Sequence, residues 1–331
     1  PMTHIGKHHV TRIWSSFHFL PYDLKASLPH RGRSYMNKYR LIGRPNGSLV
    51  TDTVEQAKKG GTLQAVGVAV HIVADTWAHM YFAGTPSLVI NNTTDWFYEL
   101  REENGKEIRK KLTFRNSLGA ADDIEEGIYT QTLSQKKEDT IMNLGHGRAG
   151  HLPDYSFIRY TYLPAWGGYE PVVKNNPDDY YHAFCQLIHV MKYLRGSCYT
   201  FRRDFYDEET VAPWKDQITA ILKKRQLDSS EDWNALAEQI SGKRLPDFTP
   251  ELYKKQYVDA PTTEEKDQTH DGKYFIAAMA QKSMVTNRIY SSGSLLAGIS
   301  IKYDNTKFKG IREFEKLLHV FHKKEDNDGN R

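Results

Sequence analysis

Residues 63–79 read Leu-Gln-Ala-Val-Gly-Val-Ala-Val-His-Ile-Val-Ala-Asp-Thr-Trp-Ala-His, a small, apolar run that predicts a buried helix at the centre of the fold. Gly84 and Pro86 follow this run, and both residue types are common just past the C-terminus of a helix. Taken together, these signals predict a helix over about residues 62–82.

Three polar side chains interrupt the apolar run at steps of four residues: His71, Asp75 and His79. Each residue advances a helix by about 100°, so a step of four turns the face by only about 40° and all three side chains share one face. Burying them is costly unless they pair or bind a cation. We expect three metal ligands, with Asp75 able to bridge two metals. The alternative is a buried His–Asp pair with a third histidine nearby by chance.

A second group of metal-ligand side chains follows in a glycine-rich loop, where His146, His151 and Asp154 stand close together in the sequence. Glycine allows backbone conformations that are closed to other residues, so such a loop can gather close-spaced side chains around a site. Imidazole and carboxylate are the usual zinc ligands where cysteine is absent. Asp154 is either a ligand or a general base for a bound water. The alternative is a surface turn in which Asp154 caps the following segment.

His18 is a third candidate ligand, because it stands between Phe17 and Phe19 in an aromatic patch near the start of the chain. A core histidine bonded to the backbone explains this pattern equally well. We therefore expect seven metal ligands at most, and among them Asp75 and Asp154 are the candidate catalytic residues.

The composition is that of an ordinary globular protein: 331 residues, 39% hydrophobic, 26% charged, with a formal net charge of +4. So small a charge gives no argument for nucleic acid, and we expect none as a partner. No apolar run approaches the ~20 residues of a membrane span, and no apolar signal core begins the chain. The sequence as given favours a cytoplasmic protein, with secretion by a signal-independent route left open.

Few segments alternate with period two for long, so the sequence predicts a mainly α fold: one multi-helix domain with long loops over residues 1–325. The charged stretch 226–272 is predicted to be a helical insertion or a lid, and 326–331 a flexible tail. Further helical patterns cover a larger set of segments, namely about 117–133, 180–195, 208–225, 230–241, 272–290 and 308–323.

Several motifs together resemble a bacterial family classified as a domain of unknown function. They are Phe17-His-Phe-Leu-Pro21, Arg44-Pro-Asn-Gly47, His71-x3-Asp75-x3-His79, Gly145-His146 through His151-Leu-Pro-Asp154, and Asn175-Asn-Pro-Asp178. The similarity runs from about residue 10 to 200. That family has no established activity, so the resemblance names no substrate.

More remotely, the motif on residues 71–79 resembles the His-x3-Asp-x(3–5)-His signature of the zinc-dependent phospholipase C and single-strand nuclease superfamily. The resemblance implies an all-α fold, a three-zinc site and a bridging role for Asp75. His151-x2-Asp154 is the nearest match to a later His-x3-acid pair and departs from it by one residue. An N-terminal residue and an early histidine complete that site in the superfamily. The implied content is therefore one to three zinc ions, with a protein partner that supplies a missing N-terminal helix as one alternative.

The two ligand groups favour a metal-dependent hydrolase of phosphoester or phospholipid substrates, because metal clusters with an open position stabilise phosphoryl transfer. A phospholipid substrate would imply peripheral membrane contact and an apolar rim, for which the candidates are Trp77, Met80, Tyr81, Phe82, Trp96 and Phe97. The competing hypothesis is a non-catalytic protein in which a metal braces the helices and the surface binds another protein. An open coordination position would favour the hydrolase, since structural zinc sites are closed.

Overall fold

The computed structural model describes residues 4–26, 38–116, 120–132, 136–294 and 296. The predicted helix over 308–323 and the predicted tail 326–331 lie outside these residues. Within the described part of the chain, no helix is both long enough and apolar enough to cross a membrane.

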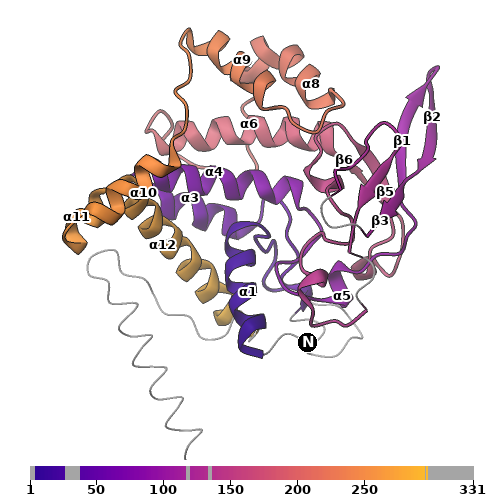
Figure 1. Cartoon of the computed structure of the whole chain (residues 1–331), viewed down its shortest axis with the longest axis horizontal. Helices are drawn as coiled ribbons and strands as arrows, with labels where there is room; N and C mark the ends of the chain where they lie inside the picture. The colour runs from indigo at the N-terminus through magenta and orange to yellow at the C-terminus, as the bar shows by residue number, and fades with distance from the viewer. Residues whose placement is uncertain (1–3, 27–37, 117–119, 133–135, 295, 297–331) are drawn as a thin grey trace, which may run out of the picture.

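The apolar run of residues 63–79 forms α4 (Leu63–Ala78), with His79 as its C-cap. Thr62 caps its N-terminus, because the hydroxyl oxygen accepts a hydrogen bond from the backbone N–H of Ala65 at 3.2 Å. Figure 1 shows α4 in the middle of the helical part of the molecule. It packs against four other helices, which are α1 (His4–Phe17), α3 (Ser48–Gly60), α6 (Asn176–Leu194) and α12 (His270–Ser291).

The central helix ends at Ala78, about one turn before the predicted end. His79 is its C-cap, and Tyr81 then takes a positive φ of 79°. The turn is stabilised by pairing with an earlier segment, since Tyr81 N donates to Gly43 O and Gly43 N donates to Phe82 O, each at 2.8 Å. His79 is consequently placed beyond the helix and is free to face a different way from His71 and Asp75.

The prediction of a mainly α fold of the phospholipase C type is wrong, because the protein is mixed α/β. Four strands form one antiparallel sheet in the order β2-β1-β5-β6, and β3 pairs with β4 in a second, parallel sheet. In Figure 1 the strands lie together at one side of the helical part. The strands are β1 (Tyr98–Glu103), β2 (Lys106–Lys111), β3 (Thr113–Arg115), β4 (Ile128–Thr130), β5 (Arg159–Tyr162) and β6 (Val172–Asn175).

β1 and β2 were not predicted from the sequence, because their side chains are mostly polar and show little alternation between polar and apolar residues. The turn between them does carry a hairpin signal. Asn104 and Gly105 both have positive φ, 52° and 72°, which is the conformation of the tight turns that Asn-Gly favours in hairpins. The hairpin is fully paired, from Tyr98 opposite Lys111 to Glu103 opposite Lys106.

The helix predicted over 117–133 is also wrong for the described residues 120–132, which contain turns and β4. Its acidic residues bond to the backbone instead. Asp122 Oδ1 accepts from Thr130 N at 2.7 Å, and Asp123 Oδ1 accepts from Glu126 N at 3.1 Å. Short carboxylates compete with helix formation by such local bonds.

The remaining described helices are shorter. Those within residues 208–241 lie on the outer side of α6, those within residues 250–268 pack on α12, and the one at residues 88–91 lies nearer the strands (Figure 1). The segment 226–272 contains three of them and is mostly exposed; its role as an insertion or a lid stays a prediction. These helices are α5 (Leu88–Asn91), α7 (Glu208–Val211), α8 (Lys215–Lys223), α9 (Ser230–Ser241), α10 (Pro250–Asp259) and α11 (Thr263–Gln268). Short 3-10 turns lie at Ile141–Asn143, Leu152–Asp154, Ala165–Gly167 and Ala212–Trp214.

The aromatic residues predicted to form an apolar rim lie mostly in the core. Trp77, Met80, Phe82 and Phe97 are buried. Of the other two, Tyr81 packs on Trp166 and Trp96 on Tyr98. A buried aromatic cluster packs between the sheet and the end of α4, next to the ligand residues; its largest members are Phe19, Phe82, Phe97, Tyr129, Tyr160 and Tyr162.

Candidate metal centre

His18, His71 and Asp75 form the first of two side-chain groups that could hold a metal ion. Asp75 Oδ2 lies 2.9 Å from His18 Nδ1 and 3.3 Å from His71 Nε2. α1 ends at Phe17 and delivers His18, while α4 carries the other two residues one turn apart. The three ligand atoms lie within 4.8 Å of one another, which is close enough for one ion to contact all of them.

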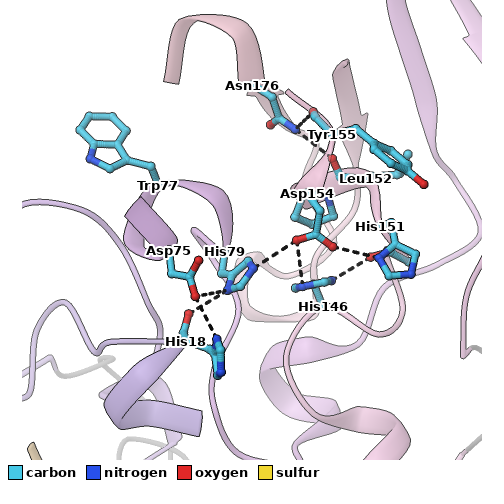
Figure 2. Close-up of polar contacts among 12 residues, drawn as sticks. His18, Asp75, Trp77, His79, His146, His151, Leu152, Asp154, Tyr155 and Asn176 are labelled. Atoms are coloured by element: carbon cyan, nitrogen blue, oxygen red, sulfur yellow. Dashed lines mark hydrogen bonds and ion pairs between the residues drawn. The ribbon is translucent and has the colours of Figure 1, made fainter. Parts of the chain in front are cut away.

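His79, His146 and Asp154 form the second group. Asp154 Oδ1 lies 3.2 Å from His79 Nε2 and 3.6 Å from His146 Nε2. The other oxygen of Asp154 lies 3.0 Å from His151 Nδ1 (Figure 2). Both carboxylate oxygens of Asp154 therefore face imidazole rings, and His151 joins the group through Asp154 rather than as one of its three closely spaced ligands.

His79 connects the two groups, because its two ring nitrogens face different carboxylates. Its Nε2 belongs to the second group, and its Nδ1 lies 3.7 Å from Asp75 Oδ2 in the first (Figure 2). The expected ladder on one helix is thus divided: His71 and Asp75 join His18, whereas His79 turns to the glycine-rich loop. His79 is the C-cap of α4, with its N–H still bonded to Asp75 O, so its ring lies at the end of the helix and can reach both Asp75 and the glycine-rich loop.

Main-chain oxygens orient the two most buried imidazoles. His79 Nδ1 donates to the carbonyl of His18, and His146 Nδ1 donates to the carbonyl of Gly150, each at 2.8 Å. With Nδ1 donating, Nε2 is the nitrogen that each neutral ring would offer to a metal, and in both rings this nitrogen lies on the side of Asp154. Ligand histidines of metalloproteins are typically held in this way by a second hydrogen bond.

Two buried asparagines anchor the glycine-rich loop, Asn91 to the segment after α4 and Asn176 to the start of α6. Asn91 Nδ2 lies 3.1 Å from Ala83 O, just after α4, and 2.8 Å from Asn143 O at the start of the loop. Asn176 Nδ2 donates to Leu152 O at 2.9 Å and to Tyr155 O at 2.8 Å, one bond on each side of Asp154 (Figure 2). These bonds fix both ends of the segment that bears His146 and Asp154.

The electrostatic surroundings set the protonation of the ligands. Burial lowers the pKa of His71 and of His146, which favours the neutral ring that binds metal. Burial also opposes the charge of His79, but the hydrogen bond to Asp154 and the charges of Asp75 and Asp154 outweigh it and raise the pKa of His79. Asp154 is partly buried, yet His146, His151 and His79 together hold its pKa well below the usual range.

Each group borders a pocket. Asp75, His79 and Asp154 line one of about 330 Å³, whose wall includes Tyr180 of α6. His18 and His71 line another of about 1000 Å³. The side chain of His71 is 51% exposed, whereas those of His79 and His146 are 11% and 16% exposed, so the histidines of the second group are more enclosed than His71. Both groups can therefore be reached from a pocket.

A comparison with family models matches residues 2–289 to a family of unknown function, DUF6765. The chain belongs to this family. No curated protein and no solved structure matches it. The relation of this DUF6765 member to the zinc-dependent phospholipase C superfamily has no support in these comparisons, and the mixed fold contradicts the all-α architecture that the relation implied.

The sequence of this DUF6765 member predicted seven ligands, and the structure places all seven side chains around Asp75 and Asp154; that they bind a metal stays a prediction. The sequence did not predict α1, and it did not indicate that Asn91 and Asn176 hold the loop in place. Asn176 stands in the motif Asn175-Asn-Pro-Asp178, next to Pro177. Its actual bonds run to a loop over twenty residues earlier, which no local pattern could show.

Proposed function

We propose that this protein is a metal-dependent hydrolase of phosphoesters, with zinc as the ion. One observation carries the proposal: two His/Asp groups meet at one imidazole, His79, and each group borders an open pocket. Paired metals that share a site are suited to clamp the attacking and leaving oxygens of a phosphoryl transfer.

The donor atoms fit zinc in their chemistry. Each group offers two imidazole nitrogens and one carboxylate oxygen, the set that zinc accepts where thiolate is absent. Cys185 and Cys198, both free, belong to neither group. When bound, zinc supplies a positive charge that polarises a phosphoryl oxygen and makes water a stronger acid.

The residues of this chain have distinct roles in the proposal. Asp75 holds His18 and His71 around one of its oxygens. Asp154 acts as a ligand rather than as a general base, because both of its oxygens already face imidazoles. The carbonyls of His18 and Gly150 keep His79 and His146 in the ligand tautomer. Tyr180 holds the loop from the pocket side by donating to Pro153 O.

The openness of the first group favours this function over the non-catalytic alternative. A metal that only braces helices sits in a closed shell of four protein ligands. Here the first group offers three side chains, and His71 is half exposed at the edge of a pocket. A ligand from solution or from a substrate can therefore complete the coordination.

The test combines metal analysis with an activity assay. We expect the purified, zinc-loaded protein to contain about two zinc ions and to hydrolyse bis(4-nitrophenyl) phosphate. His146→Ala should lose one zinc and at least about 100-fold in kcat/KM. His182→Ala is the matched control, because His182 lies on α6, bonds to Asp178 O and belongs to neither group.

Two results would count against the proposal. A folded protein that binds no zinc would refute the metal centre itself. Tightly bound zinc without hydrolysis of any phosphoester would favour the bracing role instead.

A further inference from the structure

An apolar groove extends away from the first ligand group. It lies among α1, α4, α10 and α12, and its largest apolar and aromatic members are Ile13, Phe17, Leu63, Tyr253, Tyr274 and Phe275. Its volume of about 1000 Å³ is at the upper end of the range of small-molecule sites in proteins.

The groove is continuous with the candidate metal centre. His18 and His71 line it directly, and both also contact Asp75 Oδ2. A molecule whose phosphate is held at the first ligand group would therefore place an adjoining substituent in the groove. The two features adjoin at His71, whose exposed ring lies at their border.

The groove wall is mostly apolar, and besides the two candidate ligands its polar members are Gln64 and His270. Among the described residues that line it, none is a lysine, arginine, aspartate or glutamate. The smaller pocket differs, because Asp75 and Asp154 both line it. Without cationic side chains, the groove offers nothing to the further phosphates of a polyanionic ligand such as a nucleic acid.

The apolar side chains of the groove also remain exposed to solvent. Leu63, the first residue of α4, is 83% exposed, and Tyr274 and Phe275 are both exposed on α12. Neighbouring exposed apolar side chains on a protein surface commonly mark a binding site. A bound hydrocarbon chain would cover this apolar surface, and it carries no charge that would need a partner in the groove.

We infer that the substrate is a phosphoester that carries a hydrocarbon chain, and that the chain lies in the apolar groove while the phosphate reaches His18 and His71. This inference rests on the proposed function. It adds that kcat/KM depends on the length of the chain, because each buried methylene contributes a roughly constant free energy of transfer.

The experiment measures kcat/KM of the zinc-loaded protein for 4-nitrophenyl alkyl phosphodiesters from methyl to octyl. All are kept below the concentration at which they aggregate, so that each acts as a monomer. We expect kcat/KM to rise by up to about fourfold for each methylene that becomes fully buried.

Two matched leucine variants locate the effect. Leu63→Ser changes an exposed leucine of the groove, and Leu227→Ser changes another exposed leucine, at 52% exposure, that does not line it. The ratio of octyl to methyl kcat/KM should fall severalfold in Leu63→Ser and stay at the wild-type value in Leu227→Ser. Phe275→Ser should act as Leu63→Ser does.

The outcomes separate the two proposals. Equal kcat/KM for all chain lengths, with clear hydrolysis of the methyl ester, overturns the groove inference and leaves the hydrolase standing. An equal fall of the ratio in both leucine variants also overturns it. If no ester of the series is hydrolysed, the proposed function fails and the inference fails with it.

Discussion

Gly150 is the residue on which the orientation of His146 depends most directly. Its carbonyl accepts the hydrogen bond from His146 Nδ1, and its φ is +55°. A Cβ atom at this position would lie 2.0 Å from Thr130 O. Only glycine allows the backbone to take this conformation and to pass so close to β4.

We predict that Gly150→Ala lowers the free energy of unfolding by more than about 2 kcal/mol, from the positive φ and the contact with Thr130 combined. Gly168→Ala is the control, since Gly168 has a φ of +71° but nothing within 4 Å of an added Cβ. Gly168→Ala should lower the free energy of unfolding by about 1 kcal/mol, from the backbone conformation alone. Urea unfolding of the two variants measures both changes. Equal losses of stability would show that the close approach of residue 150 to Thr130 does not contribute.

The sequence indicated which candidate ligands lie close together, but not how they divide into two groups. The residue types and spacings of His71, Asp75, His79 and of the glycine-rich loop sufficed to predict ligands. The separation of His79 from His71 could not be predicted, because it depends on the early end of α4 and on the carbonyl of His18. Both are products of tertiary contacts.

The helices and strands differ in how well the sequence predicted them. α9 matches its predicted range, and α12 matches within two residues at its start and one at its end. Both have clear helical patterns and cap residues before them. The sheet was missed, because β1 and β2 are short, polar strands whose pairing depends on the turn at Asn104 and Gly105 and on partners far along the chain.

Glu99 of β1 connects the sheet to the helical part. It is buried, and Arg225, which follows α8, binds it with two nitrogens, at 2.7 Å to Oε1 and 3.1 Å to Oε2. Arg101 adds a third bond at 2.8 Å. Burial opposes the charge of Glu99, but the hydrogen bonds and charges of Arg225 and Arg101 outweigh it and lower the pKa of Glu99.

We predict that Glu99→Gln lowers the free energy of unfolding by about 2 kcal/mol at pH 7, because it removes charged hydrogen bonds to two arginines. A lowered pKa in the folded state means that the carboxylate stabilises the fold above its ordinary pKa near 4.5. This contribution is lost as the pH falls below that value. The difference between wild type and Glu99→Gln should therefore shrink toward pH 3 in urea unfolding.

Glu102→Gln serves as the control, because Glu102 lies on the same strand but is exposed. It should change the free energy of unfolding by less than about 0.5 kcal/mol at either pH. A difference between wild type and Glu99→Gln that stays constant from pH 7 to pH 3 would contradict the role assigned to the carboxylate.

At the scale of the whole molecule, the candidate centre joins three distant stretches of chain: residue 18, residues 71–79 and residues 146–154. The unfolded chain does not hold these together, so a metal ion binds the folded state preferentially. Binding of this kind stabilises the fold in proportion to the logarithm of the ligand concentration.

We predict that free zinc at about 100 times its dissociation constant adds about 2.7 kcal/mol to the free energy of unfolding. For a chain of this size the thermal midpoint should rise by about 4 °C. Scanning calorimetry with added zinc and with a chelator measures the shift. His146→Ala should show a smaller rise, and His182→Ala the full one. The same midpoint under both conditions would rule out a preferred folded-state site.

The hydrogen bonds from His79 and His146 to main-chain oxygens have a consequence for how this protein tolerates mutation. Every amino acid has a carbonyl, so no single substitution at residue 18 or 150 deletes the acceptor atom. It can only displace it by moving the backbone. The orientations of the two rings therefore depend on the course of the backbone. Variants that keep this backbone course keep both imidazoles in place, even when the neighbouring side chains differ.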